Sequence, residues 1–358
     1  MNNKNSLINK QLEEHVSIII DTLLSTISGV HTIILYGSYG RSEGAWIKAS
    51  ETYNPYNDYD LLIVLEDEAK HPKDLPSIKE KLLNQINIKW VDLSFVSLTK
   101  FIGNRNKSIF QYDLIYGSKV IFGNFKILES IQKFDSSEIN LNEGKLLFFT
   151  RLWAFMGGVV TVKDLNSSEA IFFRYQMSKV VLAVVDMILL INGRYVSSYV
   201  ERCNLAIKIC KREDILKKEL INWAINEKLN PSTKVMTKKE VICLQENVAN
   251  IFSIYALRLL SIIHKKNFSN LVDFKNLYAT SLFERLKIFA GLILRKNTNY
   301  RKVYILNIIQ ILIVSNILGQ VSLKWTLNEC NKLLQKIGFE STKNLDQLRQ
   351  LVANERFN

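Results

Sequence analysis

Apolar residues at the start of the chain recur first with helical spacing and then in short runs typical of buried strands. Positions 12 to 27 carry Leu, Val or Ile every three or four residues, and Gly29 is placed to end the helix that this spacing predicts. Three strands are predicted further along: the apolar runs at 33–36 and 61–65 and the alternating run at 91–95.

A second helix is predicted between the last two of these strands. Apolar positions from 78 to 86 follow helical spacing, and Ser77-x-x-Glu80 has the form of a capping box at the start of this helix. One more helix and one more strand are predicted between 101 and 122. The order of these elements predicts a mixed sheet with flanking helices over residues 1–135.

Beyond residue 135 the pattern is almost wholly helical. Residues 123–137 are polar and aperiodic, so a domain boundary is predicted there. Helical spacing fills 136–275 and continues over 276–358, which is either part of the same bundle or a separate region. The predicted fold class is therefore α+β, with a mixed-sheet domain at 1–135 followed by an all-α helical bundle.

A long apolar helix is predicted in the second half, with Ser167 or Ser168 as its cap and Gly193 at its end. Three side chains with polar groups share one stripe of this helix: Tyr175, Lys179 and Asp186. A charged pair on a mostly buried helix must be satisfied by other groups. The spacing leaves open whether this stripe faces a ligand cleft or pairs inside the bundle.

The composition indicates a globular protein. The chain of 358 residues is 47% apolar, which is enough for buried cores in two or three domains. Its four cysteines show no C-x-x-C spacing and its four histidines are scattered, so neither a zinc site nor a disulfide framework is predicted. The N-terminus has no apolar signal core, and the apolar stretches at 181–191 and 303–318 are interrupted by polar residues. We therefore expect a cytoplasmic protein without a membrane span.

The net charge of +13 is unevenly distributed. Residues 1–135 carry 15 Lys and Arg against 16 Asp and Glu, whereas the remainder carries 32 against 18. A basic helical half could attract a triphosphate, a nucleic acid or an acidic surface. The alternative is a general enrichment of the chain in lysine that implies no partner.

A Gly-Ser turn and three aspartates stand at the ends of the predicted strands. Gly37 and Ser38 end the first strand, and such a small-residue turn exposes backbone N–H groups that can cradle a phosphate. Asp58 and Asp60 stand two apart at the head of the second strand, so both point to one face. Asp92 leaves the third strand on the face opposite its apolar neighbours. The pattern predicts three carboxylates beside a phosphate cradle.

These carboxylates predict a metal site, because oxygen ligands without a nearby His or Cys suit Mg²⁺ or Mn²⁺ rather than zinc. Three aspartates would repel a nucleoside triphosphate unless divalent cations lay between them. Two ions about 4 Å apart can lower the pKa of an attacking hydroxyl and neutralise a leaving pyrophosphate. The constellation predicts nucleotidyl transfer. The alternatives are a solvated strand end and, from another class, a non-catalytic nucleotide sensor or interaction protein.

The motif resembles the signature of the polymerase-β-like nucleotidyltransferase superfamily: a Gly-Ser after a strand, an Asp-x-Asp on the next strand and a third Asp on a later one. Gly37-Ser38, Asp58-Tyr59-Asp60 and Asp92 match it in order, within the first third of the chain. Arg41 and Glu43 follow the turn much as in relatives of the antibiotic-modifying members. The loop before the Asp-x-Asp is longer than is usual in the family, and the extra residues either form part of a lid or acceptor wall or are inert.

The resemblance implies an enzyme that moves a nucleoside monophosphate from a triphosphate, foremost ATP, to an acceptor hydroxyl with two Mg²⁺ ions and release of pyrophosphate. Asp58 and Asp60 would bind both ions, and Asp92 would bind the ion that activates the acceptor. Either Asp92 or a carboxylate of the helical domain would accept the acceptor's proton. Five residues are expected to contact the nucleotide: Gly37, Ser38, Arg41, Tyr175 and Lys179.

Three classes of acceptor remain open. A small hydroxylated molecule is favoured, because antibiotic-modifying members of the superfamily also carry a helical domain after the catalytic one. RNA, such as a tRNA end, is suggested by the basic second half. A protein acceptor leaves no distinguishing mark in the sequence.

Overall fold

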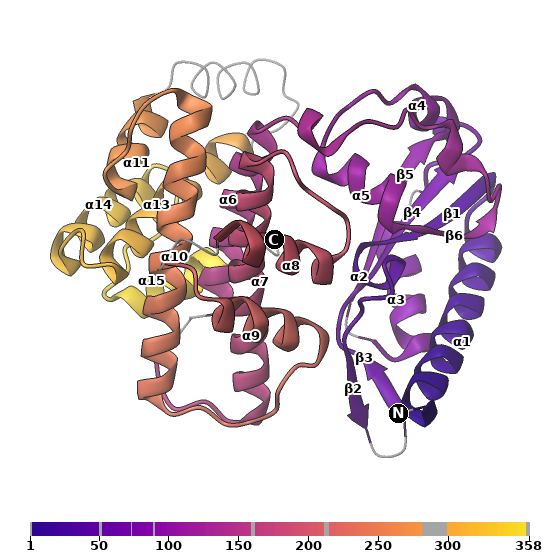
Figure 1. Ribbon diagram of the computed structural model, residues 1–358, viewed down its shortest axis with the longest axis horizontal. Helices are drawn as coiled ribbons and strands as arrows, with labels where there is room; N and C mark the ends of the chain where they lie inside the picture. Colours follow the sequence, from indigo (N-terminus) through magenta and orange to yellow (C-terminus); the bar gives the residue numbers. More distant parts are fainter. Residues whose placement is uncertain are drawn as a thin grey trace. The chain divides into compact units, whose positions relative to one another are not determined.

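The computed structural model describes residues 2–49, 52–72, 74–88, 90–158, 162–210, 215–280 and 299–355 (Figure 1). These residues form an α+β protein with a four-stranded mixed sheet and many helices, which confirms the predicted fold class at that level. The chain divides into two compact units. The first unit contains residues 1–140, 193–205 and 228–231, and the second contains 141–192, 206–227 and 232–358.

The first unit is built on a sheet with the strand order β5-β4-β1-β6 (Figure 1). Its strands are β1 (Val30–Tyr36), β4 (Tyr59–Leu65), β5 (Val91–Ser97) and β6 (Lys119–Gly123). β1 pairs antiparallel with β4 and β6, whereas β4 pairs parallel with β5. A parallel pair needs a crossover connection, which contains α3 (Leu75–Ile86). Within this pair Asp60 lies opposite Asp92.

Helices cover both faces of the sheet, because successive side chains of a strand point to opposite faces. On one face, Ile33 and Leu61 belong to a core cluster with residues of α1 (Asn2–Thr26) and α3. On the other face, Ile34 and Leu62 belong to a cluster with residues of α4 (Leu98–Gly103) and α5 (Ile109–Gly117). The central strands β1 and β4 are therefore buried on both sides, which explains their continuous apolar runs.

Two predicted helix caps in this unit are wrong. α3 begins at Leu75 and not after the predicted cap Ser77, because Asp74 accepts a hydrogen bond from the Ser77 backbone N–H (3.2 Å) and a proline occupies the first turn. α1 ends at Thr26, and Gly29, with a φ of +66°, lies in the turn that leads into β1. In both places the apolar spacing predicts the helix correctly. The residue at which α3 begins and the residue at which α1 ends depend on local hydrogen bonds and backbone angles, which the spacing does not show.

The segments on either side of the carboxylate strands also differ in detail from the prediction. Residues 101–122, predicted to hold one helix, contribute to both α4 and α5, because Ser108 caps a new helix by accepting a hydrogen bond from the Gln111 backbone N–H (3.0 Å). The insertion before the Asp-x-Asp contains β2 (Trp46–Ala49) and β3 (Thr52–Pro55), which pair antiparallel. The insertion is thus a regular element of the first unit.

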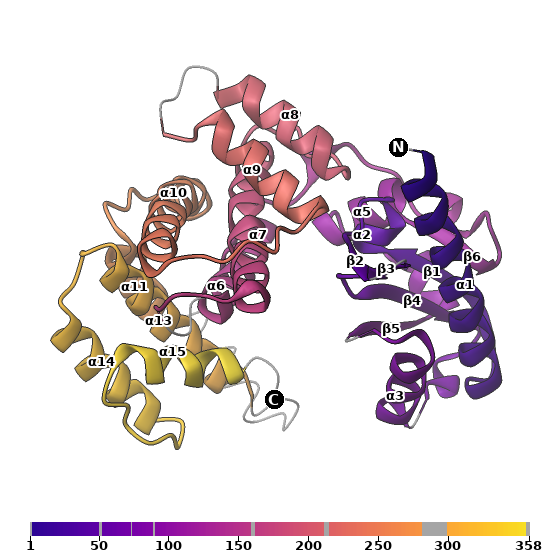
Figure 2. The ribbon, with the colours of Figure 1, turned by 90° about the horizontal axis from the view of Figure 1, so that it is seen from below.

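Helices are the regular elements in the described part of the second unit, where an isolated bridge also joins Leu165 to Met236. α7 (Ser167–Ile191) is its most buried helix and packs against α6 (Asn142–Gly158) and α10 (Lys238–His264) (Figure 2). α8 (Tyr199–Ile209) and α9 (Lys218–Leu229) each contribute residues to both units. Beyond α10 lie α11 (Leu271–Thr280), α13 (Asn299–Ile317), α14 (Leu323–Gln335) and α15 (Leu345–Asn354).

α7 is capped by Asn166 and not by the predicted Ser167 or Ser168. The Asn166 side chain accepts a hydrogen bond from the Glu169 backbone N–H (3.0 Å), and the Glu169 carboxylate accepts one from the Asn166 backbone N–H (3.1 Å). Asparagine and serine are about equally good caps, so residue type alone did not distinguish them. The helix ends just before Gly193, which has a φ of +62°.

One helix among the described residues, α10, is long and apolar enough to cross a membrane by length and composition. The sequence pattern had not singled it out. Of its most apolar stretch, 56% is buried inside the protein, as is typical of a core helix.

Candidate functional site

Three carboxylates meet where β4 and β5 begin. Asp60 is the second residue of β4, Asp58 directly precedes that strand, and Asp92 is the second residue of β5. One oxygen from each carboxylate lies within 4.8 Å of the other two. Asp58 and Asp60 are partly buried, whereas Asp92 is exposed and has Lys79 Nζ 3.8 Å from one of its oxygens. The parallel pairing of the two strands thus brings together the three aspartates that the sequence singled out.

The Asp60 carboxylate lies in surroundings that disfavour its charge. Burial and the negative charges of Asp58 and Asp92 raise its pKa from an ordinary 3.8 to about 7, although the positive charges of Lys228 and Arg41 act in the opposite direction. A cation among such like charges relieves their repulsion. The cluster could hold a metal ion, and a set of oxygen donors suits a hard divalent cation.

A tight turn at Gly37 lies directly against Asp60. Gly37 has a φ of +66°, which glycine adopts without strain, and it opens the short helical turn α2 (Gly37–Gly40), in which Ser38 is buried. A Cβ atom on Gly37 would lie 1.9 Å from Asp60 Oδ2. Any other residue at this position would displace the carboxylate, so the turn and the acidic cluster form one local structure.

Arg41, which follows this turn, lies in a buried ion network. Its Nη1 is 3.3 Å from Asp113 Oδ2 and its Nε is 3.4 Å from Glu43 Oε2, with 6% of the side chain exposed. Asp113, on α5, also accepts hydrogen bonds from Arg202 Nη2 (2.9 Å) and from the Tyr195 hydroxyl (3.2 Å). The structure therefore gives Arg41 two carboxylate neighbours in its own unit, and its contact with a nucleotide stays a prediction.

Glu43 caps the N-terminus of α8 from a distant part of the chain. Its carboxylate accepts hydrogen bonds from Ser198 Oγ (2.8 Å) and from the backbone N–H groups of Tyr199 (2.9 Å) and Val200 (3.2 Å). A carboxylate stabilises this end of a helix because it pairs the orphan N–H groups and complements the helix dipole. Together with the contacts of Asp113, this cap attaches residues 193–205 to the first unit.

Three cations surround the ring of Tyr199. Arg41 Cζ, Arg202 Cζ and Lys228 Nζ lie 4.7, 4.9 and 5.5 Å from the ring centroid. Lys228 is only 4% exposed, and its charge acts on the Asp60 carboxyl. No sequence motif points to Lys228 or Arg202, because each comes from a later segment whose local pattern is simply helical. Only the tertiary fold, which places both residues in the first unit, brings them to the ring of Tyr199.

Tyr175 and Lys179, the other two residues expected to bind the nucleotide, belong to the second unit. Tyr175 is 4% exposed within α7, and Lys179 Nζ lies 4.9 Å from the centroid of its ring. Asp186, on the same predicted stripe, is 5% exposed. The stripe is therefore largely buried, and its predicted contact with a nucleotide stays a prediction.

No protein-family model matches the chain, and neither a curated protein nor a solved structure matches it.

Proposed function

We propose that the first unit is a polymerase-β-like nucleotidyltransferase domain and that the protein is a metal-dependent nucleotidyltransferase. The observation that carries this proposal is the meeting of three carboxylates, with oxygens within 4.8 Å of one another, beside the positive-φ turn at Gly37. Further support comes from the order of the motif along the chain and from the position of Asp60 and Asp92 on adjacent parallel strands.

The donor set fits Mg²⁺ or Mn²⁺. Asp58, Asp60 and Asp92 offer only carboxylate oxygens, and their crowded negative charge favours a cation. These residues would hold two ions, which when bound would lower the pKa of the acceptor hydroxyl and neutralise the leaving pyrophosphate.

The remaining roles belong to groups around the carboxylates. The backbone N–H groups of Gly37 and Ser38 would donate to the β- and γ-phosphates, and the missing side chain at Gly37 lets a ligand approach closely. Lys228, a buried cation whose charge acts on Asp60, would complement the negative charge of the triphosphate. Asp92, the most exposed of the three carboxylates, would accept the acceptor's proton.

The acceptor that fits best is a small hydroxylated molecule, and the nucleotide is a triphosphate, foremost ATP. This choice depends on the resemblance to antibiotic-modifying members with a helical second domain. The basic charge after residue 135 favours RNA as the second candidate. Binding of RNA would weaken steeply with added salt, whereas binding of a neutral small acceptor would not.

Incubation of the full chain with each α-labelled nucleoside triphosphate, Mg²⁺ and a cell lysate tests the proposal. The lysate is then separated into RNA, protein and metabolites, and the labelled pool identifies the acceptor. We expect label in the metabolite pool and loss of labelling in Asp60→Asn.

Asp21→Asn is a matched control, because Asp21 is an exposed aspartate of the same unit outside the acidic cluster. It should label as the wild type does. Full labelling by Asp60→Asn, or no labelling by the wild type with any triphosphate, would overturn the enzymatic proposal.

A further inference from the structure

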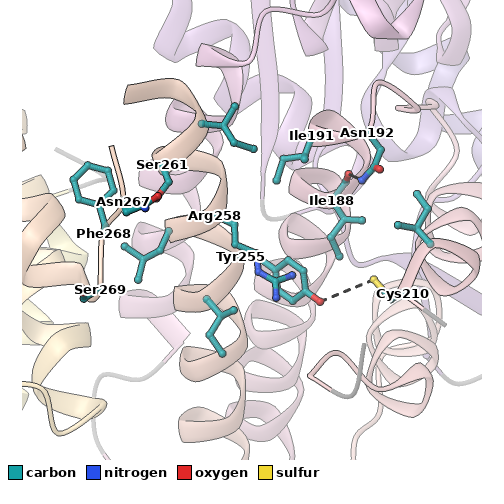
Figure 3. A pocket seen from close by; sticks show the side chains of 14 residues that line it. Ile188, Ile191, Asn192, Cys210, Tyr255, Arg258, Ser261, Asn267, Phe268 and Ser269 are labelled. Atoms are coloured by element: carbon teal, nitrogen blue, oxygen red, sulfur yellow. Dashed lines mark hydrogen bonds between the residues drawn. The ribbon is translucent and has the colours of Figure 1, made fainter. Parts of the chain in front are cut away.

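Each of the two units contains a cavity. In the second unit, a cavity of about 590 Å³ lies among the ends of α7 and α8, α10 and residues 267–269 (Figure 3). None of the residues given a role in nucleotidyl transfer lines it. In the first unit, a cavity of about 380 Å³ is lined in part by residues that follow Gly37 and Ser38 along the chain. This first-unit cavity is therefore the one that bears on the nucleotide.

The first-unit cavity is lined by Ile8 and Asn9 of α1, residues 42–44, Trp46 at the start of β2, and residues 229–230. All of these residues belong to the first unit. The volume of the cavity lies within the range of about 300–1,000 Å³ that is typical of small-molecule sites. Segments that are far apart along the chain thus meet around a space large enough for an organic ring.

Hydrogen bonds join the wall of this cavity to the proposed site. The Glu43 backbone N–H donates to the carbonyl oxygen of Ser38 (2.8 Å), which belongs to the proposed phosphate cradle. The Ala45 backbone N–H, between two lining residues, donates to Asn57 Oδ1 (2.8 Å), and Asn57 directly precedes Asp58. The cavity therefore lies next to both the turn and the carboxylates that would hold the triphosphate.

The strand order separates this cavity from the acceptor. Residues 42–46 continue from the end of β1, whereas Asp92 lies on β5, on the other side of β4. Asp92 is the carboxylate assigned to the acceptor, so the acceptor would lie on the β5 side of the acidic cluster. The first-unit cavity is thus on the side of the donor nucleotide.

Trp46 offers a flat aromatic surface to the cavity. Its ring packs against the core cluster that contains Ile33 and Leu61, and it also lines the cavity, so it is only partly buried. The Tyr39 ring meets it edge to face, with centroids 5.5 Å apart, and the Tyr39 hydroxyl donates to the Ala45 carbonyl oxygen (2.8 Å). These contacts fix the indole in place. An aromatic ring of this kind can stack on any nucleobase, because every base has a π-face.

Two exposed asparagines, Asn9 and Asn230, bring polar groups to the same cavity. Neither amide has a hydrogen-bond partner among the described residues. Each amide carries a donor and an acceptor side by side, and the edge of a nucleobase such as adenine presents the complementary pair. A stacking ring with amides around it favours a planar heteroaromatic ligand over a hydrocarbon.

We propose that the first-unit cavity holds the nucleobase of the triphosphate, stacked on Trp46 and hydrogen-bonded along its edge by Asn9 and Asn230. The phosphates lie at the Gly37 turn, and the acceptor lies on the side of Asp92. This base subsite depends on the nucleotidyl transfer proposed above, because it belongs to the same nucleotide.

Calorimetric titration of the full chain in the presence of Mn²⁺ tests this proposal with two ligands. One is an ATP analogue with a methylene bridge between its α- and β-phosphates, which blocks transfer, and the other is tripolyphosphate, which has no base. We expect Trp46→Leu to bind the analogue about tenfold more weakly, because base stacking is lost, and to bind tripolyphosphate as the wild type does. Circular dichroism shows whether this variant keeps its fold.

Asn230→Ala changes an exposed side chain and decides the outcome if Trp46→Leu does not fold. It should bind the analogue about fivefold more weakly and tripolyphosphate unchanged, because only a hydrogen bond to the base is lost. Asn84→Ala is the matched control, because Asn84 is an exposed asparagine of α3 outside the cavity. It should bind both ligands as the wild type does.

Two results would overturn the base subsite and leave the metal and phosphate site in place. One is equal affinity of the wild type for the analogue and for tripolyphosphate. The other is wild-type affinity for the analogue in both Trp46→Leu and Asn230→Ala. Failure of the wild type to bind either ligand would instead overturn the proposed function, and the base subsite with it.

Discussion

Asp113 and Arg202 form a close ion pair, in which Arg202 Nη2 lies 2.9 Å from Oδ1 and 3.1 Å from Oδ2 of the aspartate. Only 3% of the Arg202 side chain is exposed. Asp113 also lies 3.3 Å from Arg41, so one carboxylate faces two guanidinium groups. Through this pair, residues 193–205 are attached to the unit that carries the acidic cluster.

Asp113→Ala should destabilise the protein, because it leaves two mostly buried arginines without this carboxylate. We expect a loss of about 2 kcal/mol in the free energy of unfolding, below the usual cost of breaking a buried pair because a fifth of the Asp113 side chain is exposed. Urea unfolding followed by circular dichroism measures this loss. Glu68→Ala breaks an exposed pair with Lys100 and should cost less than about 1 kcal/mol. Equal losses in the two variants would contradict the role of Asp113.

Gly37→Ala should abolish metal-dependent release of pyrophosphate while the protein stays folded. A Cβ atom at Gly37 meets the Asp60 carboxylate, and the positive φ adds strain of about 1–2 kcal/mol. A coupled pyrophosphate assay and circular dichroism give the two measurements. Gly103→Ala is the matched control, because a Cβ atom there has no neighbour within 4 Å. Activity of Gly37→Ala at the wild-type level would show that the Asp60 position does not depend on this glycine.

Asp60→Asn should raise the melting temperature in the presence of a chelator. The variant removes one of three crowded negative charges, whose repulsion and partial burial oppose folding when no cation is bound. The same variant should lose the stabilisation that the wild type gains from added Mn²⁺. Thermal unfolding with and without Mn²⁺ measures both effects. A lower melting temperature in chelator would mean that Asp60 has a structural partner that outweighs the repulsion.

His15 should make the stability of the first unit depend on pH. Its Nδ1 lies 3.0 Å from the Tyr59 hydroxyl, and burial lowers its pKa below the ordinary 6.5, although Glu14 acts in the opposite direction. The unfolded chain therefore takes up this proton more readily than the folded one. The stability that neutral His15 provides is complete above about pH 6.5 and is lost as the pH falls below that value.

His15→Gln should accordingly show a smaller loss in the free energy of unfolding than the wild type between about pH 7.5 and pH 5.5. Urea unfolding at a series of pH values measures the two slopes. His71→Gln, at an exposed position, should keep the wild-type slope. Identical slopes in all three proteins would rule out a contribution from His15.

The parts of the fold that the sequence predicted are those set by local periodicity. The strands that carry Asp60 and Asp92 follow from short apolar runs, and their pairing is the simplest arrangement of neighbouring strands with a helical crossover. The acidic cluster could therefore be predicted residue by residue. Helix ends could not, because competing caps such as Asp74 and Ser77 differ only in local geometry.

The ion network of Arg41, Asp113 and Arg202 could not be predicted from the sequence either. Arg202 and Lys228 reach the first unit only because the chain returns to it twice, and no local pattern encodes such a return. The role of Glu43 as a cap for α8 depends on the same return. Charge patterns are informative about partners only once the tertiary fold has brought the charges together.

The central claim is that Asp58, Asp60 and Asp92 jointly hold divalent cations, and electron paramagnetic resonance of free Mn²⁺ tests it most directly. Titration of the wild type and of Asp21→Asn should remove Mn²⁺ from solution with the same affinity, and more tightly when a non-hydrolysable triphosphate is present. Asp60→Asn should bind Mn²⁺ at least about tenfold more weakly in both conditions. Equal Mn²⁺ binding by Asp60→Asn and the wild type would contradict the account.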